Sequence, residues 1–258
     1  MAETLDAAFM DPQTTALAAL FFAVAVLYSS VGHAGASGYL AAMALLGFAP
    51  EQMRPTALTL NILVGGIGLV RFHRAGLVPW RKVLPFVSAS VPMAYLAAQW
   101  QVPKATYGML LGGLLAAAAL AAWRSGERLA EVGEIPVSRP VPWPAALLAG
   151  ALIGGLSGIT GTGGAIFLTP LLLAMAWAHT REASGLSVAF VWLNSLAAVF
   201  GLLRSSQSFP DALPIWLAAA ALGAVLGTQL GIHRWPVHRL RKSLAVVLLI
   251  AAAKLLFG

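Results

Sequence analysis

The chain has 258 residues, of which 59% are hydrophobic and only 10% are charged. Roughly a quarter of the residues of an ordinary soluble domain are charged, so this composition excludes a water-facing surface and predicts a polytopic membrane protein. Cysteine is absent, which excludes disulfides, thiolate metal sites and a cysteine nucleophile. The formal net charge of +7 indicates cytoplasmic loops rather than nucleic-acid binding, because cations gather in such loops.

The apolar segments fall into two sets in chain order. The first set spans residues 14–31, 39–48, 55–72, 83–100 and 105–123. A polar, proline-rich stretch at 124–143 follows, and we predict that it is a cytoplasmic linker. The second set spans residues 145–157, 165–177, 183–203, 213–232 and 244–257. This repetition predicts a first transmembrane repeat at 1–123 and a second at 144–258.

Basic residues predict how the repeats are oriented. They cluster between the third and fourth segments of the first half and between the fourth and fifth segments of the second half: Arg71, Arg74, Arg81, Lys82, Arg234, Arg239, Arg241 and Lys242. Both loops lie on the cytoplasmic side if each half crosses the membrane an odd number of times. We therefore predict an all-α fold of two inverted repeats with about five apolar helical segments each, roughly eight to ten in total. Both termini are then expected to be periplasmic. The N-terminal stretch MAETLDAAFMDPQ has no Lys or Arg, so it is not expected to be a cleavable signal.

A glycine-rich break separates the first two segments of each half. In VGHAGASGYL and SGITGTGGAI, three glycines (Gly32, Gly35 and Gly38) align with Gly158, Gly161 and Gly164 at one common offset. Irregular backbone is tolerated in a membrane only where protein buries it or it lines a wet cavity. Such breaks mark the substrate site of secondary transporters, and the helix start that follows favours an anion. The alternative is that these small residues only pack helices closely.

We therefore predict an anion site at membrane mid-depth, built from both breaks and the third segment of each half. No Lys or Arg is expected deep in the apolar segments, so main-chain N–H groups and hydroxyls would bind the anion. His33 would contact the anion or relay protons, or else hydrogen-bond only to exposed carbonyls. The asparagines would complete the site or join helices. The candidate substrate-binding residues are His33, Gly35, Ser37, Gly38, Asn61, Thr160, Gly161, Thr162, Gly163, Gly164, Ser187 and Asn194. Arg71 and Arg204 end the third segments and are expected to reach toward lipid headgroups.

Several stretches also resemble the sulfite exporter TauE/SafE family. GLSGITGTGGAIFLTPLLL and ASGLSVAFVWLNSLAAVFGLL resemble its second half, and YSSVGHAGASGYLAAMALLGFAPEQMRPTALTLNIL resembles its first half. The resemblance covers nearly the whole chain except the N-terminus and the linker. It implies a bacterial inner-membrane anion carrier linked to export of sulfite or small sulfonates. The family usually has a Gly-x-Gly-Gly-Gly-like break in both halves, whereas the first break here is GHAGASG, so the two half-sites are not strictly equivalent.

Three functions remain open at this stage. The leading prediction is a secondary transporter exporting a small anion; the alternatives are a passive anion channel and a membrane scaffold that does not transport. No motif for catalysis, a metal, a cofactor or ATP hydrolysis is found, so we expect neither an enzyme nor an ATP-driven pump. The expected partners are a small anionic substrate and the lipid bilayer, without nucleic acid. The oligomeric state, a homodimer included, stays open.

Overall fold

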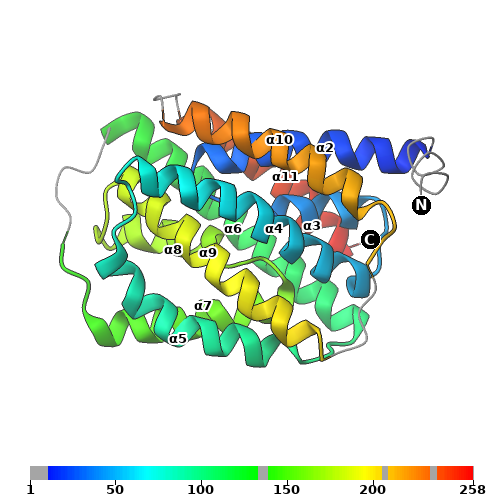
Figure 1. The fold of residues 1–258 in the computed structure, drawn as a ribbon, viewed down its shortest axis with the longest axis horizontal. Coiled ribbons are helices and arrows are strands. Elements are labelled where there is room, and N and C mark those ends of the chain that lie inside the picture. Colours follow the sequence, from blue (N-terminus) through cyan, green and yellow to red (C-terminus); the bar gives the residue numbers. More distant parts are fainter. Residues whose placement is uncertain (1–10, 133–138, 205–208, 233–236, 258) are drawn as a thin grey trace.

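The computed structural model describes residues 11–132, 139–204, 209–232 and 237–257. These residues form ten helices and no strand, which confirms the predicted all-α class (Figure 1). The helices are α2 (Pro12–Ser30), α3 (Ala36–Leu45), α4 (Pro50–Arg74), α5 (Trp80–Ala98), α6 (Lys104–Val132), α7 (Trp143–Thr160), α8 (Ala165–Ala174), α9 (Thr180–Leu202), α10 (Leu213–Ile232) and α11 (Val237–Phe257).

Six of the described helices contain stretches long and apolar enough to cross a membrane. They are α2, α4, α7 and α9, together with Lys104–Ala121 of α6 and Leu213–Gly231 of α10. The helix α6 continues to Val132, so the start of the predicted linker is helical, whereas residues 133–138 lie outside the described residues. The chain is therefore a multi-pass helical membrane protein.

The first helix of each half packs along the fourth helix of the other half. The helix α2 lies beside α10, and α7 lies beside α5, with α4 and α9 between these two pairs (Figure 1). A Cβ on Gly150, Gly154 or Gly158 of α7 would overlap or crowd carbonyl oxygens of Phe86, Ser90 and Ala94 on α5. Glycines four residues apart on α10, namely Gly223, Gly227 and Gly231, meet Phe22, Val26 and Ser30 of α2 in the same way. Small residues at this spacing allow two helix backbones to approach closely.

These contacts also fix the helix directions. Residue numbers rise together along α2 and α10, and likewise along α5 and α7, so each pair is parallel. In contrast, Gly65 of α4 meets Trp192 of α9, and Gly68 meets Val188, so α4 and α9 are antiparallel. The helices α5 and α9 are parallel, because Gly185 meets Leu77 and Gly201 meets Tyr95.

Each short helix, together with its break, returns the chain along the helix that precedes the break. The helix α3 has 10 residues, so it spans about 15 Å at 1.5 Å per residue, half of a bilayer core of about 30 Å. Yet Gln13 at the start of α2 donates to the carbonyl of Leu46, just beyond α3. The chain therefore returns along the whole of α2 through residues 31–35 and α3. The second break and α8 have the same arrangement of elements.

The predicted alignment of the glycines between the halves is wrong. The helices α3 and α8 begin after Gly35 and Gly164, which are the corresponding N-cap residues. Gly158 lies inside α7, where it packs on α5, and Gly38 lies inside α3, where a Cβ would crowd Val24 and Tyr28 of α2. Both of these glycines therefore lie inside a helix rather than in a break, and both allow close packing against a neighbouring helix.

Candidate functional site

Left-handed glycines form both breaks. The φ angles are +78° at Gly32 and +108° at Gly35 in the first break, and +80°, +74° and +86° at Gly161, Gly163 and Gly164 in the second. Residues with a Cβ avoid this region, at a cost of roughly 1–2 kcal/mol each. Glycine therefore lets the chain turn sharply out of α2 and α7 and start a new helix inside the protein.

The two breaks lie one after the other along α4. Added Cβ atoms would place Gly161 against Arg54, near the start of α4, and would make Gly163 overlap the side-chain amide of Asn61. Farther along, Gly65 of α4 faces Ala34 of the first break, with 3.5 Å between its built Cβ and the Ala34 Cβ. The breaks therefore approach each other near Asn61, about halfway along the helix.

Asn61 joins the first break to α9 and the second break. Its Oδ1 accepts a hydrogen bond from the Ala36 N–H, at 3.0 Å, which caps the start of α3. Its Nδ2 donates to Ser195 Oγ at 3.3 Å. At the second break, Val191 of α9 and Asn61 both border Gly163, and Gly164 gives α8 no side-chain cap. The expectation that both helix starts offer free N–H groups is thus wrong for α3, because Asn61 occupies its first donor.

A second set of polar contacts lies toward the Arg71 end of α4. The Nε2 of His33 is 2.7 Å from Thr169 Oγ1, which is 2.6 Å from Ser187 Oγ. These contacts connect the first break to α8 and α9. The sequence suggested His33 and Ser187 but missed Thr169, although a threonine directly before Pro170 in an apolar run was a visible signal.

Arg54 was also missed, because it directly precedes the predicted third segment, yet the structure buries it inside the protein. Only 4% of its surface is exposed. Its guanidinium donates to the carbonyls of Ala98 and Gly158, both at 2.9 Å, and to that of Trp100 at 3.2 Å. These carbonyls lie at the C-terminal ends of α5 and α7, where the helix dipole favours a cation.

A polar cavity opens beside Arg54. Its volume is about 500 Å³, and it is lined by Pro50, Glu51, Arg54, Gln101, Val102, Pro103, Lys104 and Tyr107. The Tyr107 hydroxyl donates to the carbonyl of Thr160, the last residue of α7, at 2.9 Å. Tyr107 therefore connects the cavity wall to the end of α7, and the cavity holds the positive charges of Arg54 and Lys104 beside the carboxylate of Glu51.

The remaining predicted residues differ in their surroundings. Thr160 Oγ1 lies 3.1 Å from Thr162 Oγ1 and also donates to the Leu156 carbonyl. The hydroxyl of Ser37 is 2.8 Å from that of Tyr28, so it joins α3 to α2. Asn194 is fully buried, and its side-chain amide makes no hydrogen bond within the part of the chain described.

Buried glycine breaks among helices long enough to span a membrane are typical of membrane transport proteins. A family model described as "Sulfite exporter TauE/SafE" matches residues 17–255, so the chain belongs to the sulfite exporter TauE/SafE family. It is also 39% identical over 248 residues to the "Probable membrane transporter protein y4hK" of Sinorhizobium fredii, covering 96% of this chain and 100% of that protein. No solved structure matches the chain significantly.

Proposed function

We propose that this membrane transporter exports a small anion, sulfite or a small organosulfonate, across the bacterial inner membrane by alternating access. The observation that carries the proposal is the approach of both glycine breaks to Asn61, inside the protein and halfway along α4. The family description supports sulfite as the first substrate to test. Discontinuous helices that meet near mid-depth are the usual substrate sites of secondary transporters.

Helix directions support the inverted repeats of this proposal. The helices α2, α4 and α5 correspond in chain order to α7, α9 and α10. The helices α4 and α10 are also parallel, because Leu217 lies near Leu63 and Thr228 contacts Arg71. Together with the pairs described above, this makes each of these helices run opposite to its counterpart. The reciprocal packing of α2 on α10 and of α7 on α5 has the same two-fold pattern. The proposal also includes the two repeats, at 1–123 and 144–258, and the cytoplasmic position of the linker between them.

An anionic substrate is supported by the charge and polarity near the second break. Arg54 is buried, and it makes no ion pair among the described residues. Tyr107 of its cavity donates to the Thr160 carbonyl, Thr160 in turn contacts Thr162, and beyond them α8 begins without a side-chain cap. An uncapped helix start attracts anions because its N–H groups point outward and the dipole is positive there. The binding site would therefore be centred on Asn61 and on Thr162–Gly164 of the second break. His33, Thr169 and Ser187 would border the site on the side away from Arg54.

Transport by the purified full-length chain in liposomes tests the proposal. We expect saturable sulfite flux with counterflow, and no comparable flux of acetate at equal concentration. Thr162→Val should weaken sulfite affinity by about 1–3 kcal/mol, the usual cost of an unpaired buried group. Thr106→Val, at an exposed position of α6, is the matched control. Linear flux that does not saturate would indicate a channel, and unchanged affinity in Thr162→Val would refute the site.

A further inference from the structure

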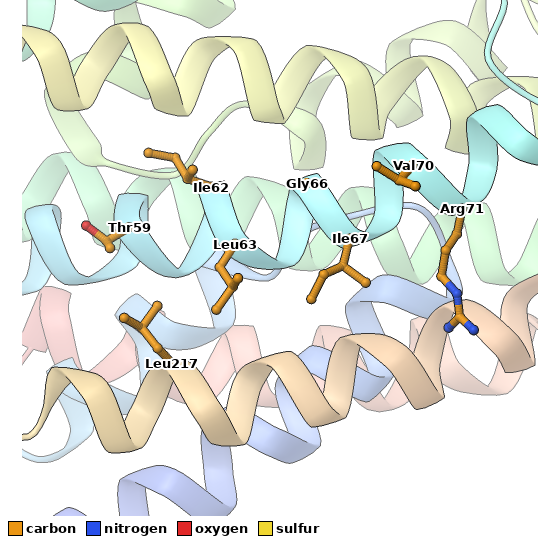
Figure 2. A pocket seen from close by; sticks show the side chains of 8 residues that line it. All are labelled: Thr59, Ile62, Leu63, Gly66, Ile67, Val70, Arg71 and Leu217. Atoms are coloured by element: carbon orange, nitrogen blue, oxygen red, sulfur yellow. The ribbon is translucent and has the colours of Figure 1, made fainter.

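An apolar groove runs along the outside of the protein between α4 and α10 (Figure 2). Its volume is about 690 Å³, and it is lined by Thr59, Ile62, Leu63, Gly66, Ile67, Val70, Arg71 and Leu217. The wall is almost entirely aliphatic, so a small hydrated anion has nothing to bind along its length. The groove therefore differs in chemistry from the polar cavity beside Arg54.

Arg71 closes one end of the groove (Figure 2). One of its terminal nitrogens donates to the carbonyl of Val225 and, at 2.7 Å, to the hydroxyl of Thr228, both on α10. The sequence predicted that Arg71 would reach toward lipid headgroups, and these contacts hold one side of its guanidinium against α10. Its other N–H groups have no acceptor, and it has no carboxylate partner, among the residues that the structure describes.

The length of the groove matches one leaflet of a bilayer. From Thr59 to Arg71 the rise along α4 is about 18 Å at 1.5 Å per residue. Half of the hydrocarbon core of a bilayer is about 15 Å. A chain anchored at Arg71 and lying along the groove would therefore end near the middle of the membrane.

We propose that this groove binds one acyl chain of an anionic phospholipid, with the lipid phosphate on Arg71. The aliphatic wall matches the hydrocarbon tail, and a guanidinium with unused donors matches a phosphate, to which it can make two parallel hydrogen bonds. Such a lipid would fill the space between α4 and α10. Because both breaks lie along α4, the bound lipid would pack against the helix that carries Asn61.

Native mass spectrometry of the purified full-length chain tests the proposal. The chain is titrated with phosphatidylglycerol and, separately, with phosphatidylcholine of the same acyl chains. We expect at least tenfold tighter binding of phosphatidylglycerol at one site. Leu63→Trp fills the groove and should remove that site. The matched control is Leu84→Trp, at a leucine on α5 that is 56% exposed and outside the groove.

Arginine variants separate the headgroup from the tail. Arg71→Gln should remove the preference for phosphatidylglycerol, and Arg71→Lys should keep most of it. The control is Arg74→Gln, which changes an exposed residue outside the groove. This variant should bind lipid as the unmodified chain does. Thermal unfolding without lipid reports whether loss of the contact with α10 by itself lowers the stability of Arg71→Gln. Unchanged lipid binding in Leu63→Trp, or a preference that survives Arg71→Gln, overturns the proposal. A dimer that Leu63→Trp dissociates, with lipid binding unchanged, would instead assign the groove to a second copy of the chain.

Discussion

Gly163→Ala tests whether the second break is a tightly fitted junction. The residue has a φ of +74°, so a side chain there costs roughly 1–2 kcal/mol in the left-handed conformation. The new Cβ would also overlap Asn61 Nδ2 and Val191 Cγ2. If Asn61 moves away, the Ala36 N–H loses its acceptor, and an unpaired buried donor costs about 1–3 kcal/mol. Together these terms predict a loss of about 2–5 kcal/mol in folding stability.

Two matched glycines isolate these terms. Gly76→Ala has the same kind of backbone, with a φ of +70°, but nothing within 4 Å of its Cβ, so only the conformational cost applies. Gly113→Ala lies in α6 with open space around it, and it should be neutral or slightly stabilising, because alanine favours a helix by about 0.5–1 kcal/mol over glycine.

Thermal unfolding in detergent, followed by tryptophan fluorescence, measures all three variants. Each kcal/mol should lower the midpoint by about 2–4 °C in a chain of this size. We expect the order Gly113→Ala highest, Gly76→Ala next and Gly163→Ala lowest, and we expect Gly163→Ala also to lose sulfite binding. A midpoint for Gly163→Ala equal to that of Gly76→Ala would show that the Asn61 junction is not tightly fitted, and the reasoning would fail.

Three further predictions concern transport, membrane orientation and helix packing. His33→Ala should slow transport and flatten its dependence on pH between roughly pH 5 and 8, where an imidazole ordinarily titrates; an unchanged rate and profile at equal expression would leave His33 a structural role only. Reporter fusions that fluoresce only in the cytoplasm should be dark at both Met1 and Gly258, which lie outside the described residues. A bright C-terminal fusion with a dark N-terminal one would contradict an odd number of crossings in each repeat. Gly154→Ala should destabilise the chain by about 1–3 kcal/mol through overpacking, because its Cβ would overlap a carbonyl oxygen of α5. The control Gly155→Ala should not destabilise the chain, because its Cβ meets only a flexible Met93 atom at 3.7 Å. Equal unfolding midpoints for the two variants would refute close packing of α7 on α5.

Helix positions were predictable because they depend on local sequence. Each apolar segment became a helix, and α10 occupies Leu213–Ile232, the predicted range. The largest differences are at polar ends, such as the start of α4 at Pro50 and the extension of α6 to Val132. A helix continues into polar residues wherever its backbone hydrogen bonds remain satisfied, whereas hydropathy reports only the part that is apolar.

The roles of individual glycines could not be assigned from their presence alone. Gly158 and Gly161 are three residues apart, yet the first packs α7 on α5 and the second turns the chain out of α7. The spacing of Gly150, Gly154 and Gly158 by four residues was the available signal for packing. The predicted alignment of the halves missed this pattern and therefore placed the second break three residues too early.

The sequence by itself determined a multi-pass helical membrane protein with a glycine break in each half, since hydropathy and glycine content are local properties of the chain. Only the tertiary structure decided what each polar side chain contacts. Arg54 reaches carbonyls of Ala98 and Gly158, and Asn61 reaches Ala36, across long separations in sequence. Such contacts depend on how α4 crosses α5, α7 and the first break. For this reason Asn61 caps the start of α3, whereas no side chain among the described residues caps the start of α8. This difference arises from the packing of separate helices and not from either break alone.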